Sequence, residues 1–479
     1  MKKSIWETTK IDAKTTKNNI ETDILIIGGG ITGITTSLFL STTNKKITLI
    51  ESNKIGGNTT KKTTGKISII QGYNYQEIEK NTNKKTTLKY LDSQIYALNL
   101  LIKIIKKYKI KCNLNANTTY LFTKEQKNIK KIIKEKEILE NRIKCETVNK
   151  MPNKYPCLYG LKTNNSYVFN PLKYIKFIYE LLKNKINFYE NTKALEINKK
   201  LDYYLIKTNK NKIKAKQIII CTNYPIFTKK LLIPLKTTIE KEYIITAKTN
   251  KTYKANMLCI DDEIISIRYH TDKEKYIIFS SNKSNLSNKL NHKQNINNLI
   301  NKFKNHYNYE ITNIWYNYDI KSNDNLPIIG KIKNENIYIA TAFNKWGMTN
   351  SVLAAKIISD LIKNKENDFS HIFSPYRKTN INKIVNSCIY SYNNIKAYLK
   401  ASKKQKNIKY VIENGIEYAI YTDENKVEHK IINKCPHLKC KLIFNEFNNT
   451  WDCPCHGSRY DIDGKVIKGP SNYSITPKK

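Results

Sequence analysis

Arginine and glycine are both scarce in this chain of 479 residues. Only four of its 84 basic residues are arginine, although the formal net charge is +44. The remaining basic residues are lysines spread along the chain, without clusters or interleaved aromatic residues, so we expect no nucleic-acid partner. Lysine, asparagine, isoleucine and tyrosine all have A/T-rich codons, and a nucleotide bias of the genome explains the charge. Because there are only 15 glycines, a cluster of them is informative.

Long apolar runs are missing as well. The N-terminal MKKSIWETTK is not followed by the apolar segment of a signal peptide. The most apolar stretch, residues 24–40, is interrupted by glycine, threonine and serine and is too short for a confident membrane span. We therefore expect a cytoplasmic protein with no transmembrane segment. The length predicts two or three domains.

The first glycine cluster lies inside a predicted βαβ unit at residues 22–51. Asp23–Ile27 is an apolar strand, Ile34–Ser41 starts a helix, and Lys46–Glu51 is a second strand that ends in an acid. This context turns a weak G-x-G-x-x-G pattern into a dinucleotide-binding fingerprint. A glycine-rich turn without a ligand is the alternative, and the pattern does not separate FAD from NAD.

Each residue of the fingerprint has a physical role. Gly28 permits the tight turn, and Gly30 lets the backbone approach a pyrophosphate at the helix N-terminus, where free N–H groups favour anions. Gly33 allows close packing of the helix on the strand. Glu51 can accept hydrogen bonds from the adenosine ribose.

Four of the ten cysteines lie within 21 residues near the C-terminus, where two histidines join them. Cys435, His437, Cys453 and His456 form C-x-H and C-x-x-H, and two cysteines with two histidines are the ligands of a Rieske [2Fe–2S] centre. A zinc site with the same four ligands is the main rival. The additional cysteines in both loops, and the Gly457–Tyr460 segment that follows, favour the iron–sulfur cluster.

Motifs along nearly the whole chain resemble a bacterial family of FAD-dependent oxidoreductases. This family belongs to the D-amino-acid-oxidase and glycine-oxidase-like superfamily and carries a C-terminal Rieske domain. The matching stretches are Ser4–Glu7, Ile24–Gly33, Thr63–Ser68, Phe169–Tyr174, Thr222–Pro225, Leu326–Gly330 and Ala340–Thr349. The resemblance implies FAD and a [2Fe–2S] cluster as cofactors. It also implies an α/β FAD-binding fold, a Rossmann-like βαβ unit with an interleaved antiparallel substrate-side sheet, plus a small all-β Rieske domain.

The resemblance also implies cofactor contacts beyond the fingerprint. The loop Gly56–Ser68 occupies the place of a cofactor-contacting loop, and Gly347–Thr349 would begin a helix close to the flavin, where N–H groups stabilise negative charge. An ordinary strand–loop–helix connection is the alternative for the second segment. Ala342 and Cys221 depart from the glycine and alanine expected there. The residues expected to contact FAD are Gly28, Gly30, Gly33, Glu51, Thr60, Thr64, Gly347, Met348 and Thr349.

For the C-terminal loops, the resemblance implies a disulfide and two hydroxyl groups beside the cluster. Cys440 and Cys455 pair in the respiratory type of Rieske protein, although disulfides are rare in the cytosol. Ser458 and Tyr460 would hydrogen-bond cluster sulfurs and raise the reduction potential. Lys439 stands where many Rieske loops have glycine.

The predicted domains are an FAD-dependent oxidoreductase domain at 1–380, a connecting helix or linker at 381–406, and the Rieske domain at 407–479. The substrate-side sheet is expected at about 228–330 and the flavin-side loop at 340–349. The remaining predicted elements are a largely helical Lys80–Lys150, a helix over Val168–Lys185 capped by Asn170, strands at Ile186–Glu190, Tyr203–Thr208, Gln217–Cys221 and Ile337–Thr341, antiparallel strands over Tyr243–Ser280, and helices over Ser351–Ile362 and Ile384–Ala401.

The combination of a flavin and a Rieske cluster indicates an enzyme that takes up electrons in pairs and passes them on one at a time. We expect electrons to pass from a small-molecule substrate, an amine or amino acid, to FAD, then to the cluster and an external acceptor. The alternatives are a reductase fed by an external donor through the cluster and a non-catalytic redox protein. The sequence names no catalytic residue. Arg268 is a candidate carboxylate clamp, with a surface ion pair at least as plausible.

Overall fold

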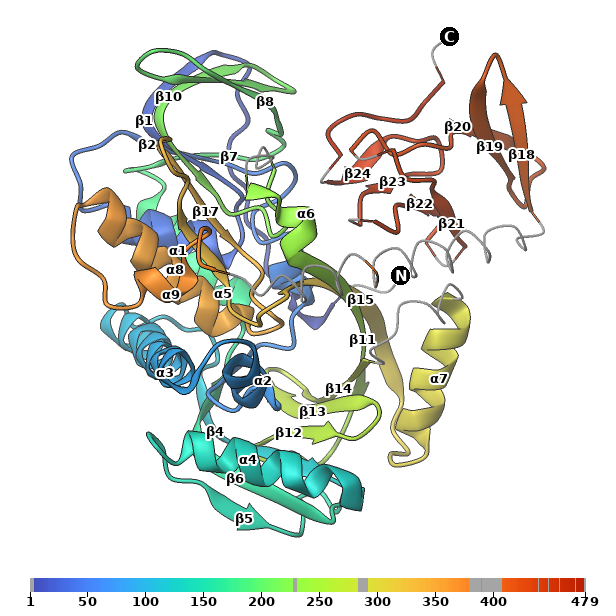
Figure 1. Cartoon of the computed structure of the whole chain (residues 1–479). Helices are drawn as coiled ribbons and strands as arrows, with labels where there is room; N and C mark the ends of the chain where they lie inside the picture. The colour runs from blue at the N-terminus through green and yellow to red at the C-terminus, as the bar shows by residue number, and fades with distance from the viewer. Residues whose placement is uncertain are drawn as a thin grey trace.

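The computed structural model describes residues 4–226, 231–282, 292–378, 389, 407–437, 439–446, 448–455, 457–469 and 471–477. Within those residues the chain folds into a large α/β body and a small all-β domain beside it (Figure 1). The linker expected at 381–406, with its helix over Ile384–Ala401, lies outside the described residues except for Ile389. None of the helices in the described ranges is long and apolar enough to cross a membrane.

The first sheet of the body contains the fingerprint strand. Its strands are β1 (Ile20–Ile27), β2 (Ile47–Ile50), β7 (Asn187–Tyr189), β8 (Ala194–Lys199), β9 (Tyr204–Thr208), β10 (Lys212–Ile220), β16 (Ile328–Lys331) and β17 (Ile337–Thr341). The path runs β16-β17-β10-β1-β2-β7, and all neighbours from β17 to β7 are parallel. Ile24–Ile27 and Ile47–Ile50 are buried without alternation, as required of strands covered on both faces.

The second sheet is mainly antiparallel and curves below the first in Figure 1. Its strands are β3 (Lys66–Ser68), β4 (Asn115–Thr123), β5 (Glu146–Val148), β6 (Tyr159–Val168), β11 (Thr237–Lys248), β12 (Ala255–Ile260), β13 (Ile264–Thr271), β14 (Lys275–Asn282) and β15 (Ile311–Ser322). The path runs β15-β11-β14-β13-β12-β4-β6-β3, and β5 pairs with β6. The fold class expected from the sequence, an α/β FAD-binding body with an antiparallel substrate-side sheet, is confirmed.

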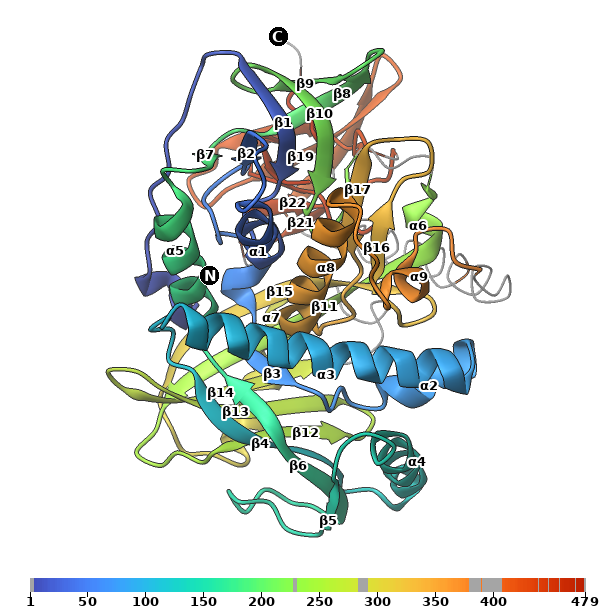
Figure 2. The same cartoon turned by 90° about the vertical axis from the view of Figure 1, so that its left-hand side faces the viewer.

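Helices fill the space around and between the two sheets. The helices are α1 (Ile31–Leu40), α2 (Asn74–Asn81), α3 (Lys84–Lys107), α4 (Ile129–Leu139), α5 (Pro171–Leu182), α6 (Ile233–Lys236), α7 (His292–Lys304), α8 (Gly347–Ile362) and α9 (Ser370–Phe373), with 3-10 turns η1 (Ile5–Thr8), η2 (Thr59–Lys62) and η3 (Gln126–Asn128). In Figure 2, α3 crosses the body between the parallel sheet above and the antiparallel sheet below. Asn170 caps α5 as predicted, since its Oδ1 accepts hydrogen bonds from the N–H groups of Leu172 and Lys173 at 3.0 and 3.1 Å.

The prediction that Lys80–Lys150 is largely helical is wrong over β4 and β5. In β4 the side chains of Asn117, Thr119 and Leu121 are buried at every second position, the period of a strand. Charged helical segments on either side mask this short pattern in the sequence. Pairing with β12 and β6 decides the conformation, and β12 is far away along the chain.

The small C-terminal domain consists of two sheets around an aromatic core. The first sheet contains β18 (Ile408–Glu413), β19 (Ile416–Thr422) and β20 (Glu428–Ile432), and the second contains β21 (Ile443–Asn445), β22 (Thr450–Asp452), β23 (Arg459–Tyr460) and β24 (Val466–Lys468). Phe444, Trp451 and Tyr460 are almost fully buried between them. The short strands leave long loops, and these loops contain the cysteine and histidine motifs.

Candidate functional site

The glycine fingerprint forms the turn between β1 and α1. Gly28 has a φ of +115°, and a Cβ atom at this residue would lie 2.6 Å from the carbonyl oxygen of Cys221, which directly follows β10. A Cβ on Gly33 would lie 2.0 Å from the carbonyl oxygen of Gly28. Only glycine therefore allows α1 to approach the parallel sheet this closely.

The N-terminus of α1 opens into a cavity. Gly30 is its N-cap residue and provides no side-chain hydrogen bond to the first turn. The N–H of Ile31 donates to Oγ1 of Thr60 at 3.2 Å, and all three residues line the cavity. Backbone N–H groups and the helix dipole at such an end favour a phosphate group. Gly28, Gly30 and Thr60 therefore fit a dinucleotide.

Glu51 lies on the cavity wall at the end of β2 and is held rigidly. Its Oε2 accepts a hydrogen bond from the N–H of Gly29 at 2.9 Å, and its Oε1 accepts from Ser52 and from the N–H of Asn53, both at 3.0 Å. Burial raises the pKa of the Glu51 carboxyl group, and these hydrogen bonds oppose the shift. A fixed, buried carboxylate at this place fits the hydroxyl groups of a ribose.

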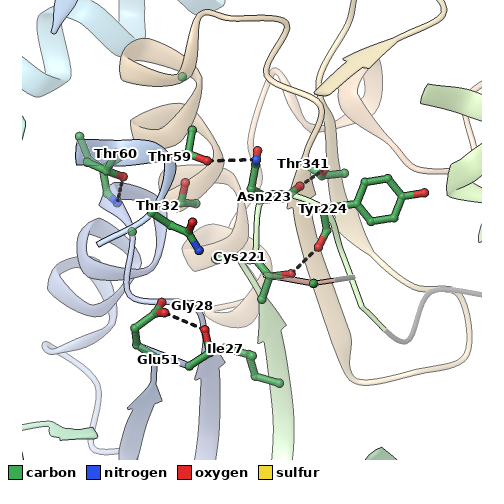
Figure 3. A pocket seen from close by; sticks show the side chains of 18 of the residues that line it. Ile27, Gly28, Thr32, Glu51, Thr59, Thr60, Cys221, Asn223, Tyr224 and Thr341 are labelled. Atoms are coloured by element: carbon green, nitrogen blue, oxygen red, sulfur yellow. Dashed lines mark hydrogen bonds between the residues drawn. The ribbon is translucent and has the colours of Figure 1, made fainter. Parts of the chain in front are cut away.

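The cavity lies at the carboxyl ends of the parallel strands, where α/β folds bind ligands (Figure 3). It contains about 1340 Å³ of space between atoms, part of it open to solvent. Asn223 links two of its walls, because its Nδ2 donates to Oγ1 of Thr59 at 3.1 Å while its carbonyl oxygen accepts from Thr341. The cavity lining includes both Glu51 at the end of β2 and Gly347 at the start of α8, as an extended cofactor such as FAD requires.

Gly347 and Met348 begin α8 and line the cavity, as do Gly28, Gly30, Glu51 and Thr60. The helix starts at Gly347, as the resemblance implies, and four residues before the start at Ser351 that the sequence pattern predicts. Three other residues expected to contact FAD are not part of the cavity lining within the described ranges, namely Gly33, Thr64 and Thr349. Oγ1 of Thr349 instead donates to Gln94 on α3 at 2.7 Å.

The loop that leads into α8 has a strained backbone. Ala342, Asn344 and Lys345 have φ values of +57°, +51° and +73°. Such conformations cost about 1–3 kcal/mol each for residues other than glycine and are concentrated at functional sites. Ala342 is the residue that replaces the expected glycine, and the structure shows why glycine suits that position.

Arg268 is neither a surface residue nor part of the cavity lining. It is fully buried, so the expectation of a surface ion pair is wrong. Its guanidinium donates to the carbonyl of Thr64, lies 3.3 Å from Nδ1 of His270, and stacks 5.6 Å from the ring of Trp6. Burial lowers the pKa of Arg268 to about 9. These contacts attach the Thr64 segment to β13, and Arg268 contributes to the cavity only indirectly.

In the C-terminal domain two loops meet and are joined by the Cys440–Cys455 disulfide. The first loop closes through a hydrogen bond from the N–H of Cys435 to the carbonyl of Cys440 at 2.8 Å. The second closes through a bond from the N–H of Cys453 to the carbonyl of Ser458 at 2.7 Å. Lys439, at the position where glycine was expected, has a φ of +59°. The disulfide removes Cys440 and Cys455 from the candidate metal ligands.

The two remaining cysteines of these loops are buried side by side. Cys435 and Cys453 are 1% and 4% exposed, and Tyr460 Oη lies 3.2 Å from Sγ of Cys435. Hydrogen bonds from Cys453 and Tyr460 lower the pKa of the Cys435 thiol against the opposing effect of burial, which favours the thiolate that iron needs. His437 lies in the first loop, whereas His456 falls outside the described residues. Two adjacent buried sulfurs with a histidine fit a Rieske cluster.

Comparison with protein families gives the decisive result for the large body. Residues 23–361 match the model of the DAO family, described as FAD dependent oxidoreductase. The chain belongs to this family. Residues 396–477 match the Rieske [2Fe-2S] domain. The predicted family and the predicted cofactors, FAD and a [2Fe–2S] cluster, are confirmed, and the protein is an oxidoreductase.

Individual relatives agree with this assignment. The DAO-family chain is 29% identical over 478 residues to the Rieske 2Fe-2S iron-sulfur protein YhfW of Bacillus subtilis (strain 168), covering 95% of this chain and 93% of the relative. Its C-terminal part is 41% identical over 65 residues to a cytochrome b6-f complex iron-sulfur subunit of Synechococcus elongatus. This match covers 13% of this chain and 36% of the subunit. The fold resembles glycine oxidase from Geobacillus kaustophilus, with a TM-score of 0.64 and 12% identity over 75% of this chain and 100% of that one. It also resembles L-amino acid deaminase from Proteus vulgaris, with a TM-score of 0.61 and 16% identity over 78% and 98%.

The Rieske domain of this DAO-family protein forms part of the wall of the cavity into which the glycine fingerprint opens. Lys468, Gly469 and Asn472 line the cavity together with residues of the parallel sheet. Nδ2 of Asn472 donates to the carbonyl of Leu195 at 2.9 Å, and Nζ of Lys193 donates to the carbonyl of Ser471 at 3.0 Å. Ser471 and Asn472 are therefore anchored to residues of the parallel sheet and its neighbouring loop.

A second contact joins the Rieske domain to the edge strand β15. Tyr316 accepts a hydrogen bond from Asn448 at 2.7 Å and lies 5.4 Å below the Arg459 guanidinium. Tyr318 donates to Asp452 at 3.3 Å, and Asp452 in turn pairs with Arg459 at 3.1 Å. Cations on aromatic rings and buried hydrogen bonds hold the two domains in one orientation.

Tyr224 connects the cavity with the cluster loops directly. It lines the cavity, and its ring meets the ring of His437 edge-on with 6.1 Å between the ring centres. No role for Tyr224, Asp319 or Lys468 was predicted from the sequence, although all three line the cavity. Tyr224 lies within the matching stretch Thr222–Pro225, which could have drawn attention to it. For an aspartate and a lysine in a lysine-rich chain, no local signal exists.

The disulfide allows a direct test of how the cluster loops are stabilised. Replacing Cys440 and Cys455 together with alanine opens a link across a sequence separation of 15 residues. We expect the Rieske domain to lose about 3 kcal/mol of unfolding free energy, because the unfolded chain gains loop entropy. Denaturant unfolding, followed by loss of the visible absorbance of the cluster, measures this effect. Cys157→Ala is the control, and equal midpoints for both variants would contradict the expectation.

Proposed function

We propose that this oxidoreductase removes hydrogen from the C–N bond of an amine or amino acid and passes the electrons through the Rieske domain to an external acceptor. When bound, FAD can take a hydride from the substrate, and the [2Fe–2S] cluster carries electrons one at a time. The names of glycine oxidase and L-amino acid deaminase, two structures with the same fold, support a C–N bond as the target.

The observation that carries the proposal is that both domains line one cavity. Lys468, Gly469 and Asn472 of the Rieske domain face the space into which the dinucleotide fingerprint opens. Tyr224 lies on the same wall and contacts His437 on its other side. A domain that only regulated stability would not need this arrangement.

Individual roles follow for the residues of the chain. In the FAD site, Gly28, Gly30 and Thr60 hold the pyrophosphate, Glu51 holds the ribose, and Gly347 and Met348 present the N-terminus of α8 to the flavin. The cluster ligands are Cys435, His437, Cys453 and His456. The hydroxyl groups of Ser458 and Tyr460 stabilise the reduced cluster by hydrogen bonding to sulfur.

Anaerobic reduction of the purified protein tests the proposal. Amines and amino acids are added to the oxidised protein, flavin absorbance is followed, and the EPR spectrum is recorded after freezing. We expect at least one compound to bleach the flavin and to produce the EPR signal of a reduced Rieske cluster. If only an external electron donor reduces the protein and no amine or amino acid does, the direction of electron flow is reversed and the proposal is wrong.

A further inference from the structure

Asp319 and Lys468 lie on the wall of the FAD cavity and come from different domains. Asp319 is near the end of β15, and Lys468 ends β24 of the Rieske domain. Phe343, Lys345 and Gly347 line the same cavity and belong to the flavin-side loop and helix. Because the charges of Lys345 and Lys468 both act on Asp319, we assign Asp319 and Lys468 to the flavin end of the cavity.

The charges of these two side chains are not satisfied by each other. Both residues are described in the structure, and no nitrogen–oxygen distance between them falls within the 4.0 Å of an ion pair. From the residues that the structure describes, Asp319 accepts one long hydrogen bond, from Nδ2 of Asn317 at 3.4 Å. Lys345, the other cavity-lining cation nearby, is paired with Glu240 at 2.8 Å. Nζ of Lys468 lies 4.8 Å from the centre of the Tyr318 ring. An acid and an ammonium group thus line one cavity without forming an ion pair with each other.

The pKa values of both groups are shifted by burial, and the charge of each group acts on the pKa of the other. Burial raises the pKa of Asp319 to about 7, and Glu242 and Glu240 add to the shift while Lys345 and Lys468 oppose it. Burial lowers the pKa of Lys468 to about 8, with Arg459 and Lys241 acting in the same direction and Asp319 and Asp452 against it. A ligand that offered a cation to the acid and an anion to the lysine would relieve both unfavourable charges.

We propose that Asp319 and Lys468 form the substrate site, and that the site takes a zwitterionic amino acid whose ammonium group binds Asp319 and whose carboxylate binds Lys468. This inference rests on the proposed function and narrows its substrate class. The Rieske domain then contributes a residue to substrate binding in addition to its redox role. Neither domain alone provides a complete site.

The same placement gives Asp319 a part in the chemistry of the substrate. An ammonium group has no lone pair, and the C–N bond can be oxidised only after the nitrogen has lost a proton. Ionised Asp319 accepts that proton, so that R-NH₃⁺ and the carboxylate become R-NH₂ and the neutral acid. A carboxyl group that titrates near neutral pH is suited to this exchange.

Binding to the oxidised holoprotein tests the site without requiring turnover. The probes are glycine, L-alanine and L-proline, each compared with its amine (methylamine, ethylamine, pyrrolidine) and its acid (acetate, propionate, cyclopentanecarboxylate). The shift of flavin absorbance on titration reports binding. We expect at least one amino acid to bind about tenfold more tightly than either analogue, the effect of one charge-assisted contact. If no amino acid in the panel binds, or if an amine or acid binds as tightly as its amino acid, the proposal is wrong.

Variants then test which side chain binds the ammonium group and which binds the carboxylate of the amino acid. Asp319→Asn is expected to weaken binding of the amino acid and the amine, whereas Lys468→Gln is expected to weaken binding of the amino acid and leave the amine unchanged. Lys468→Arg should restore much of the affinity. Lys465→Gln and Asp202→Asn, two exposed positions, are the matched controls. Flavin and cluster absorbance of each variant shows that it is folded, and equal affinities in Lys468→Gln and Lys465→Gln would overturn the proposal.

The outcomes separate this inference from the proposed function. If an amino acid binds through Asp319 and Lys468 but never bleaches the flavin, the inferred substrate site is supported and the proposed reaction is wrong. If a compound bleaches the flavin equally well in the unaltered protein and in Lys468→Gln, the proposed reaction is supported and the inferred substrate site is wrong.

Discussion

Replacing Cys435 or Cys453 with serine is expected to abolish the iron–sulfur cluster completely while leaving FAD in place. Both thiols are buried next to each other in loops closed by their own backbone hydrogen bonds, and a serine hydroxyl does not replace a thiolate as an iron ligand. Iron analysis should fall from two atoms per chain to none. The EPR signal of the reduced protein should disappear, with the flavin absorbance unchanged.

Cys157→Ser is the matched control for the cluster variants. Cys157 is partly exposed and lies in the FAD domain, so its replacement should leave iron content and EPR signal as they are in the unaltered protein. Survival of a normal Rieske signal in either Cys435→Ser or Cys453→Ser would refute the ligand assignment. Stoichiometric zinc with no EPR signal in the unaltered protein would do the same.

Gly33→Ala is expected to give a protein that no longer retains FAD. The added methyl group would lie 2.0 Å from the carbonyl oxygen of Gly28, and backbone atoms on both sides cannot yield cheaply. The helix α1 must move away from β1, which displaces the phosphate-binding N–H groups at its N-terminus. Overpacking of this kind costs about 3 kcal/mol or more of unfolding free energy. Flavin content after gel filtration and denaturant unfolding measure the two effects.

Gly72→Ala provides a control of the same chemistry in the same domain. Gly72 has a φ of +71°, but a Cβ there would meet only Leu258 Cδ2 at an ordinary 3.6 Å. We expect a loss of about 1 kcal/mol from backbone strain and full retention of FAD. A Gly33→Ala protein that binds FAD as well as Gly72→Ala would show that close packing at Gly33 does not shape the cofactor site.

The sequence by itself determined the features that depend on short spacing. The turn at Gly28–Gly33 needs only neighbouring residues and an apolar strand before it, and Gly28 and Gly33 face backbone atoms as the pattern requires. The loops around Cys435 and Cys453 are likewise closed by hydrogen bonds within a few residues. Residues close together in the sequence determine such local geometry. For this reason the family, the fold class and the cofactors could be predicted from the motifs.

Only the tertiary structure decided what lies between the two cofactor sites. The strand β4 was predicted as helix because its pairing partners are distant in the chain. Tyr224, Asp319 and Lys468 share one cavity although more than a hundred residues separate Lys468 from the other two. No local pattern marks Asp319 or Lys468, since their place in one cavity arises from the docking of the Rieske domain onto β15. Long-range packing, not sequence spacing, brings a lysine of one domain and an acid of the other into one cavity.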